Sequence, residues 1–514
     1  MIDKPLGYII GESTPFRAYF IAERPPKIGE YVVVGFEDRD VLGLVENCLS
    51  GNPIVPSNVT SISHAEHALR FNTSSKTYLK GSIRFLSYIE PLLEKGILVT
   101  PKTPPRPLSP VFEADENVLA EIFSMKKIGR SKIRVGTLVS NPKVPVYVNV
   151  NSIVSRHLAI LAVTGAGKSN TVSIITQKIV EELNGTVLIF DMHSEYSFSK
   201  ISSKQEVLPP KLNPLALTKA ELLQLMRVQP NASNQERVFR TAYDSVYEEF
   251  IQGKIQPTEF FDKLKEEIDT IMRRGKDTGT RNAAAALLNK IDDVVERYSD
   301  IFDFYLAKEL SDMVKPGRLN IFDLGEVDEE GADVIVSHYL RRLLSERKQW
   351  YRTRSAKGYP VPILCVLEEA HVLIPREEDT LTKYWASRVA REGRKFGVGL
   401  VLVSQRPKAV DENTLSQMNN KIILKLIEPS DQRYVQAASE QLSDELLELL
   451  PSLDVGEAIL IGEMTILPAL VKIDKHPGKK MGSDIQVTDE WSKYLEEQEK
   501  RKELARKILE DMEG

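Results

Sequence analysis

The sequence predicts an α/β protein in which a parallel sheet follows an N-terminal barrel of short strands. Three observations support this prediction. The first 150 residues contain short β-branched or aromatic runs separated by turn residues, a pattern typical of a small barrel. From about residue 157, strand and helix patterns alternate, which implies a parallel sheet. At residues 158–170 an apolar run ends in a glycine-containing loop, and a helical pattern follows at once.

The composition is that of an ordinary globular protein. The chain has 514 residues, of which 42% are hydrophobic and 27% are charged, enough for roughly two to four domains. The formal net charge of -5 gives no overall basic field, so any contact with nucleic acid must come from local basic patches. The two cysteines, Cys48 and Cys365, fall in different predicted domains, which favours free thiols and a reducing cytoplasm. No signal peptide and no apolar run of about 20 residues is apparent, so we expect a soluble protein without membrane contact.

We expect an N-terminal β-barrel domain over residues 1–150. Its strand candidates are residues 7–11, 18–22, 31–36, 41–48, 82–88, 96–100, 132–139 and 144–150. A basic run at residues 126–132 has the charge to contact phosphates, but such a run is more often a solvated loop. No constellation of metal ligands or of acid and base groups stands out in this part of the sequence.

Residues 158–170 predict a phosphate-binding loop between a strand and a helix. Backbone N–H groups of such a loop and of the helix N-terminus bind phosphate. Lys168 adds positive charge at the β- and γ-phosphates, and Ser169 offers a hydroxyl ligand for Mg²⁺. Ala162 stands where the usual pattern has glycine, and alanine fits there if its φ stays negative. A plain glycine turn with a surface lysine is the alternative, and the flanking strand and helix patterns disfavour it.

Acidic and amide side chains follow three further strand patterns. Asp191 to Tyr196 come after the strand at residues 186–191, where α/β sheets bind ligands. Residues 361–367 run into two acids: the first, Glu368, is expected to orient Mg²⁺, and the second, Glu369, to act as catalytic base. Gln405 ends the strand at residues 397–404 and is placed to sense a γ-phosphate. The alternative is that these strands end in solvated turns.

Helical segments interrupt and follow the predicted sheet. Residues 211–315 predict a helical insertion that opens with a capping box, Thr218 and Glu221. The stretch at residues 289–292 imitates a guanine-recognition motif, but it lies inside a helical pattern and not at a strand end, so we reject that function. A basic turn at residues 273–281 is interpreted as a solvated turn. Residues 476–514 predict a highly charged C-terminal arm that packs on a neighbouring subunit.

Arginines and lysines supply candidates for contacts with a neighbour or with a polynucleotide. Residues 386–396 carry three arginines, and an arginine offered to a neighbour's nucleotide stabilises transition-state charge. Taken singly, each arginine is more often a surface ion-pair partner. Arg376, Lys383 and Lys408 follow core strands and are candidates for DNA contacts.

Together these stretches resemble the HerA family, which is related to FtsK-like DNA motors. The resemblance spans nearly the whole chain and rests on residues 164–170, 191–196, 367–371, 404–407 and 453–458. It implies a RecA-like P-loop ATPase core over residues 151–475 and a HAS-barrel-like domain before it. It also implies a homohexameric ring that uses ATP and Mg²⁺ to thread double-stranded DNA. A partnership with the nuclease NurA in processing DNA ends for recombination is implied as well.

The resemblance assigns roles residue by residue. Glu369, Lys168, Gln405 and Arg394 are the catalytic set, with Gln405 as sensor and Arg394 as a finger acting on the neighbouring subunit. Ser169 and Glu368 are expected at the metal. The family's second stretch usually reads Asp-Pro-His-Gly-Glu-Tyr, and Met192 and Ser194 depart from it. The nucleotide-binding set is Thr164, Gly165, Ala166, Gly167, Lys168, Ser169, Asn170, Arg156 and Glu195.

Two other functions remain as alternatives from the sequence. One is a secretion or conjugation ATPase that moves protein or a DNA–protein complex. Such relatives usually carry membrane segments, and DNA-stimulated hydrolysis separates the two hypotheses. The other is a nucleotide-gated clamp or scaffold that binds DNA and recruits a nuclease. The intact-looking base Glu369 argues against the clamp.

Overall fold

The N-terminal strands close into a barrel in the order β1-β2-β5-β4-β3-β6. Its strands are β1 Gly7–Ile10, β2 Arg17–Ala22, β3 Tyr31–Phe36, β4 Arg39–Gly51, β5 Tyr78–Tyr88 and β6 Pro110–Glu113. Alternate residues such as Ile9, Phe20, Val32 and Ile83 point inward and are fully buried, as the period-2 pattern requires.

The structure is a computed structural model that describes residues 4–36, 39–52, 61–63, 66, 77–126, 129–306, 309–355, 357–439, 441–478, 487–488 and 491–501.

Two sequence-based expectations for the barrel need correction. Residues 96–100 form no strand, because Gly96 adopts φ 64° and ends helix α2 (Ile89–Lys95); the closing strand is β6. The strands β7 (Lys132–Leu138) and β8 (Pro145–Asn149) do not belong to the barrel. They pair with each other, and β7 pairs with β17 (Ala469–Ile473) in the large sheet. The sequence shows that these residues form strands but does not show their distant partners.

The large sheet has the strand order β11-β12-β10-β13-β14-β9-β15-β16-β17-β7-β8. From β11 to β15 every pairing is parallel, and from β15 onward every pairing is antiparallel. All residues of β9, β10, β13 and β14 are buried, as expected for strands covered on both faces. The remaining strands are β11 Gln205–Leu208, β12 Leu319–Asp323, β10 Val187–Asp191, β13 Ile363–Leu367, β14 Val398–Ser404, β9 Leu158–Leu161, β15 Asn420–Ile423 and β16 Glu457–Ile461.

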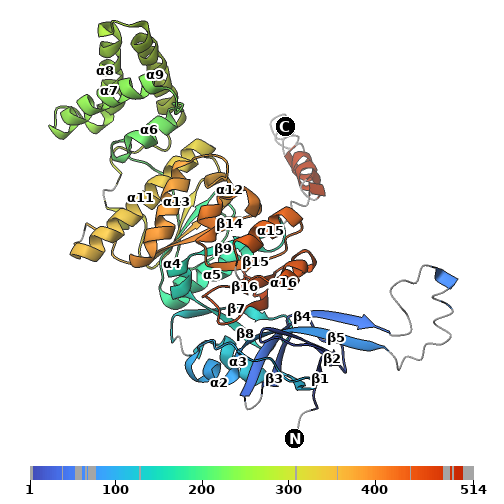
Figure 1. Cartoon of the computed structure of the whole chain (residues 1–514). Coiled ribbons are helices and arrows are strands. Elements are labelled where there is room, and N and C mark those ends of the chain that lie inside the picture. Colours follow the sequence, from blue (N-terminus) through green and yellow to red (C-terminus); the bar gives the residue numbers. More distant parts are fainter. Residues whose placement is uncertain are drawn as a thin grey trace, which may run out of the picture. The chain divides into compact units, whose positions relative to one another are not determined.

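Helices cover the two faces of this sheet (Figure 1). Helix α5 (Lys168–Leu183) packs on one face, where its Val172, Ile175 and Ile179 share a core with Val187 and Ile189 of β10. Helices α11 (Glu329–Thr353) and α13 (Leu381–Glu392) share the other core with the alternate β10 residues Leu188 and Phe190. Short helix α4 (Val150–Arg156) leads into β9. The two cores hold the central strands rigid, and their carboxyl ends carry the site described below.

The predicted helical insertion is present between β11 and β12. It contains α6 Lys219–Leu225, α7 Ser233–Ile251, α8 Phe260–Arg274, α9 Thr278–Arg297 and α10 Leu310–Met313. Helices α7, α8 and α9 lie side by side (Figure 1). The capping box of Thr218 and Glu221 is confirmed. Residues 289–292 lie within α9, so the rejection of a guanine-recognition motif is consistent with the fold.

The chain divides into two units, residues 1–479 and residues 480–514. In the second unit, residues 487–488 and 491–501 are helical. Trp491, Tyr494 and Leu495 are exposed there; packing of this arm on a neighbouring subunit stays a prediction. Within the described ranges, no helix combines the length and the apolar character needed to cross a membrane.

Candidate nucleotide-binding and hydrolysis site

The phosphate-binding loop connects β9 to α5 in the conformation that the sequence predicted. Gly165 and Gly167 adopt φ values of 78° and 105°, a region that glycine enters without steric cost. Ala162, at the position of the usual first glycine, is fully buried and is not among the residues with positive φ. Alanine therefore fits this position, because the condition that its φ must not be positive is met. Helix α5 begins at Lys168 and has no acidic residue in its first turn. The free N–H groups at the positive end of the helix dipole therefore lie next to the loop.

Three side chains from distant parts of the chain meet at this loop. The ammonium of Lys168 donates a 2.7 Å hydrogen bond to Oε1 of Glu369, and both side chains are almost fully buried. Gln405 donates its amide to the same carboxylate oxygen at 2.6 Å, and Thr164 donates to Oε1 of Gln405. Strands β9, β13 and β14 are parallel, so their carboxyl ends share one edge and bring these residues together.

Glu369 is held as an anion in a constrained position. Its backbone adopts φ 44° and ψ 49° at the start of the short helix α12 (Ala370–Leu373). Burial raises the pKa of Glu369, but His371, Lys168 and Gln405 outweigh burial and lower the pKa to about 2. An ionised carboxylate at the edge of a phosphate-binding loop is suited to take a proton from water.

His371 was not given a role from the sequence, although it stands two residues after the predicted base. Its Nδ1 lies 3.2 Å from Oε2 of Glu369 and 3.4 Å from Oγ of Ser404. His193, in the turn after β10, has Nε2 4.0 Å from Oε1 of Glu369. No spacing in the chain signals the His371 contact, because it depends on the left-handed turn at Glu369.

Glu368 is fully buried beside the loop, and the residues around it fit a divalent cation. Neither of its oxygens has a hydrogen-bond partner of ordinary geometry among the described residues. Burial raises the pKa of Glu368 well above its usual value; Lys168 opposes the rise, and Asp191 and Glu195 add to it. Tyr196 and Asp191 both contact Glu368, and a divalent cation beside Glu368 would neutralise the charge that burial disfavours. Ser169, half-buried in the first turn of α5, adds a hydroxyl.

Asp191 and Ser194 organise the turn that carries Glu195. The carboxylate of Asp191 accepts backbone hydrogen bonds from Glu195, Tyr196 and Ser197 at 3.0, 2.9 and 2.8 Å. Ser194 has φ 58°, and its hydroxyl donates to Asp323 at 2.6 Å. The serine thus adopts the left-handed backbone that suits the family's glycine. This turn places Glu195 near Glu368.

The side chain of Asn170, a member of the nucleotide-binding set that the resemblance implied, contacts the backbone of the segment after β17. Its side-chain amide donates to the carbonyl of Asp474 at 2.9 Å and accepts from the backbone N–H of His476 at 2.8 Å. Asn170 therefore ties the loop helix to the segment after β17. Its side chain is occupied with backbone, and only its backbone N–H remains for a phosphate.

The two arginines expected near phosphates lie at the opposite edge of the sheet. Arg156 precedes β9 and pairs with Glu463 at 3.1 Å. Arg394 lies in the turn η5 (Gly393–Lys395) before β14, where it is exposed and lines a cavity of about 690 Å³ with Arg130. The phosphate-binding loop follows the other end of β9, so neither arginine joins the Lys168 and Glu369 group of its own chain.

The structure also separates the three candidates for DNA contacts. Arg376 and Lys408 line one cavity of about 610 Å³, together with Arg406 and His371 and with four acids, Glu377, Glu378, Glu428 and Asp431. Lys383 instead donates to the carbonyls of Arg376 and Glu378 at 3.3 and 2.9 Å. The ammonium of Lys383 thus stabilises the turn that contains Arg376 and Glu378. Arg376 and Lys408 remain at the cavity beside the Glu369 site.

Two models of known protein domains match the sequence of this chain. A domain described as "Helicase HerA, central domain" matches residues 133–343, and "HAS barrel domain" matches residues 6–91. The "DNA double-strand break repair helicase HerA" of Saccharolobus solfataricus is 43% identical over 96% of this chain and 97% of its own. The protein of the same name from Pyrococcus furiosus is 31% identical over 95% and 97%.

Among solved structures, the plasmid coupling protein TrwB in complex with a non-hydrolysable GTP analogue matches the fold. It is 14% identical, with a TM-score of 0.50 over 70% of this chain and 94% of that one. At this identity the likeness concerns the P-loop ATPase fold. Relatives match this chain over nearly their whole length, and Lys168, Glu369 and Gln405 meet at one site. The chain therefore belongs to the HerA helicase family and is an ATP-hydrolysing enzyme with an N-terminal HAS barrel.

Proposed function

We propose that this chain is an ATP-driven motor that assembles as a homohexamer and translocates double-stranded DNA. It would act with a NurA-like nuclease in resecting DNA ends for recombinational repair. The meeting of Lys168, Glu369 and Gln405 at one sheet edge carries the proposal. The relatives named as DNA double-strand break repair helicases, matched over nearly their whole length, support the repair role.

Hydrolysis follows from a change of partner at Lys168. Its ammonium now pairs with Glu369; bound ATP phosphates attract the ammonium more strongly than one carboxylate does. Oε1 of Glu369 is then released to accept a proton from the attacking water, which the Gln405 amide helps to hold. Mg²⁺, held by Ser169 and Glu368, would neutralise charge on the phosphates.

The ring is needed because the arginines lie at the far edge of each motor. Arg394 is exposed and has no ion pair within the described residues, so a neighbouring chain can approach it. In a ring, Arg394 and Arg156 of one chain would reach the nucleotide of the next. Such arginine fingers contribute about 10³–10⁵-fold to phosphoryl-transfer rates.

Arg376 and Lys408 are the proposed contacts with the DNA backbone. Both follow the carboxyl ends of β13 and β14, the edge of the sheet that also carries Glu369 and Gln405. Contacts with phosphates carry little sequence information and weaken steeply with salt. We therefore expect binding with little sequence preference and strong salt dependence.

Displacement of a third strand from a DNA triplex tests translocation. The wild-type chain should displace the third strand with ATP, and Glu369→Gln should bind ATP while hydrolysis falls about 100-fold or more. Lys168→Ala should lose both binding and displacement. A clamp would bind the duplex and leave the third strand in place, which would contradict the motor. A motor specialised for protein transport would hydrolyse ATP equally well without DNA.

A further inference from the structure

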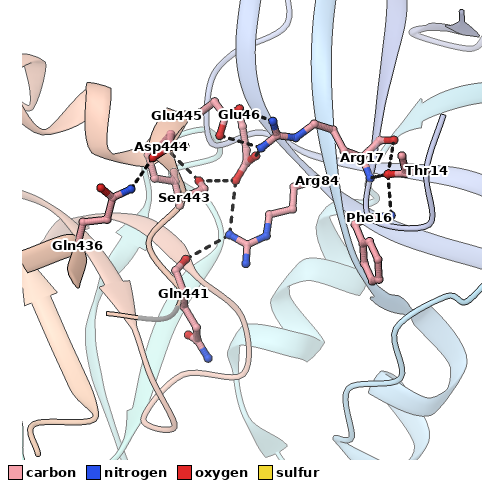
Figure 2. Close-up of polar contacts among 11 residues, drawn as sticks. Thr14, Phe16, Arg17, Glu46, Arg84, Gln436, Gln441, Ser443, Asp444 and Glu445 are labelled. Atoms are coloured by element: carbon pink, nitrogen blue, oxygen red, sulfur yellow. Dashed lines mark hydrogen bonds and ion pairs between the residues drawn. The ribbon is translucent and has the colours of Figure 1, made fainter. Parts of the chain in front are cut away.

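A cluster of charged and polar residues joins the barrel to the motor (Figure 2). The barrel contributes Arg17 of β2, Glu46 of β4 and Arg84 of β5, and the motor contributes Ser443 and Glu445 of α16 (Asp444–Leu449) and its N-cap. We call these five residues the latch. Glu46 is 1% exposed, and a carboxylate buried to this extent needs close partners.

The barrel alone leaves this cluster with an excess of positive charge. Arg17 and Arg84 are directly opposite each other in the β2–β5 pairing, an arrangement in which like charges repel. Glu46 lies at the register shift between Val45 and Asn47, and such a bulge turns a side chain away from the regular alternation. Its carboxylate lies 3.3 Å from Arg17 and 3.6 Å from Arg84. One carboxylate thus serves two guanidinium groups.

The motor supplies the missing partners. Glu445 accepts a 2.8 Å hydrogen bond from Nη2 of Arg17, and its other oxygen forms an ion pair with Nη1 at 2.6 Å. Arginine binds carboxylate best when both oxygens are engaged. The hydroxyl of Ser443 donates to Glu46 at 2.6 Å, and the carbonyl of Gln441 accepts from Arg84 at 3.2 Å. Figure 2 shows Arg17, Arg84 and Ser443 converging on Glu46, with Glu445 beside Arg17 and Gln441 beside Arg84. Charge is balanced only when barrel and motor segments are joined.

The same motor segment ends at the phosphate-binding loop. From α16 the chain continues through the turn η7 (Leu450–Ser452) to Gly456. The N–H of Gly456 donates to the carbonyl of Ala166 at 2.9 Å. A Cβ on Gly167 would lie 3.3 Å from the Gly456 backbone. Between the two anchors, Leu446, Leu450 and Leu453 are buried, so residues 443–456 form a packed connection.

We propose that the latch positions the phosphate-binding loop. The barrel fixes one end of residues 443–456, and the other end braces Ala166 and Gly167 in the conformation that receives phosphate. Preorganisation of this kind determines affinity, because a loosely held loop must be ordered when ligand binds. Arg17, Glu46, Ser443 and Glu445 are positioning residues, since none of them lies at the nucleotide site.

The test compares two neutralised glutamates on one helix of the full-length chain. Glu445→Gln removes the charge that pairs with Arg17, whereas Glu448→Gln removes an exposed charge without an ion pair within the described residues. The probe is a fluorescent, slowly hydrolysed ATP analogue, with thermal unfolding recorded in parallel. Glu445→Gln should weaken analogue binding roughly 3- to 10-fold, within the roughly 2- to 30-fold range of long-range couplings, while its melting temperature stays near that of Glu448→Gln. Glu448→Gln should bind as wild type does.

A second pair of variants keeps the test decisive. Arg17→Gln should weaken binding in the same way, and Arg17→Gln combined with Glu445→Gln should weaken it no further, because both remove one interaction. Wild-type affinity in Glu445→Gln, or an equal loss in Glu448→Gln, would overturn the proposal. These outcomes concern affinity differences between variants, so they stand whatever the wild type does with DNA.

Discussion

At the scale of single residues, the proposed role of Glu369 as catalytic base depends on the contacts that hold its carboxylate. Lys168 and Gln405 both contact its Oε1, while His371 lies at its Oε2. When ATP draws Lys168 away, His371 remains as the contact on the far side of the carboxylate. Ser404 in turn lies against the His371 ring at the end of β14. The orientation of the base therefore depends on a residue that touches neither phosphate nor metal ligand.

His371→Ala should lower kcat about 10- to 100-fold and leave KM for ATP within about twofold. The reason is that a misplaced base slows proton transfer without touching the phosphate contacts. His371→Asn keeps an amide near the position of Nδ1 and should recover part of the rate. Steady-state kinetics at several ATP concentrations separate the two parameters. A rise in KM with unchanged kcat would assign His371 to binding instead.

At the scale of elements, His157 fixes β9 between its neighbours. It follows α4 with φ 61° and is 2% exposed. Its Nδ1 accepts the N–H of Leu400 at 3.1 Å, and its Nε2 faces the carbonyl of Ala390 at 3.0 Å. These two bonds require the neutral ring with its proton on Nε2. Burial lowers the pKa of His157 to about 4, against the carbonyl of Ala390, which raises it.

The stability of the chain should therefore fall as pH drops from about 6.5 to about 4. In the unfolded chain the ring takes a proton near pH 6.5, whereas in the fold it stays neutral down to about pH 4. Within this window the unfolded state binds more protons, so acid favours unfolding, by up to about 3 kcal/mol at the lower end. Denaturant unfolding at a series of pH values measures the slope. His157→Asn should be less stable at pH 7 but should show a shallower slope, and an unchanged slope would exclude His157 as its source.

Prediction from sequence succeeded for elements whose pattern is local. The expected strand at residues 31–36 coincides with β3, and the one at residues 186–191 differs from β10 by a single residue. The 25-residue helix α11 was not singled out, since residues 331–340 are buried all round and leave no amphipathic stripe. The paired strands β7 and β8 were recognised but assigned to the wrong sheet, because β7 joins β17, a partner more than 300 residues away.

Within the site as well, contacts that follow from a local sequence pattern were predictable, and contacts that depend on distant segments or on backbone angles were not. Lys168 and Glu369 are 201 residues apart, yet their meeting was predictable, because both follow carboxyl ends of parallel strands. The contact of His371 with Glu369 depends on the backbone angles of Glu369. The contact of the Asn170 side chain with Asp474 depends on the position of the segment after β17. Neither leaves a mark in the sequence.

At the scale of the whole molecule, one chain holds only part of the proposed catalytic set. Lys168, Glu369 and Gln405 meet at one edge of the sheet, while Arg394 is exposed beyond the other edge. If Arg394 acts on a neighbour, two inactive variants must complement each other in a mixed ring. One subunit would then supply the loop lysine and the next would supply the arginine.

Mixing Lys168→Ala and Arg394→Ala chains should therefore restore part of the hydrolysis that each lacks alone. Each variant is expected to retain about 0.1% of wild-type turnover or less, the activity left by a loss of about 10³-fold at the lower end of the finger effect. Activity should reach a maximum at intermediate mixing ratios. Mixing Lys168→Ala with Glu369→Gln is the control, because both residues belong to one edge of one chain and no interface becomes complete. A flat profile for the first mixture would place Arg394 outside the neighbour's site.

The most direct measurement is ATP hydrolysis with and without linear double-stranded DNA, made on wild-type material whose mass in solution is determined in the same buffer. The account predicts particles with the mass of six chains, hydrolysis that duplex DNA stimulates severalfold, and loss of that stimulation as salt is raised. A chain that remains monomeric with DNA and nucleotide present, and hydrolyses ATP at one rate in both conditions, would contradict it.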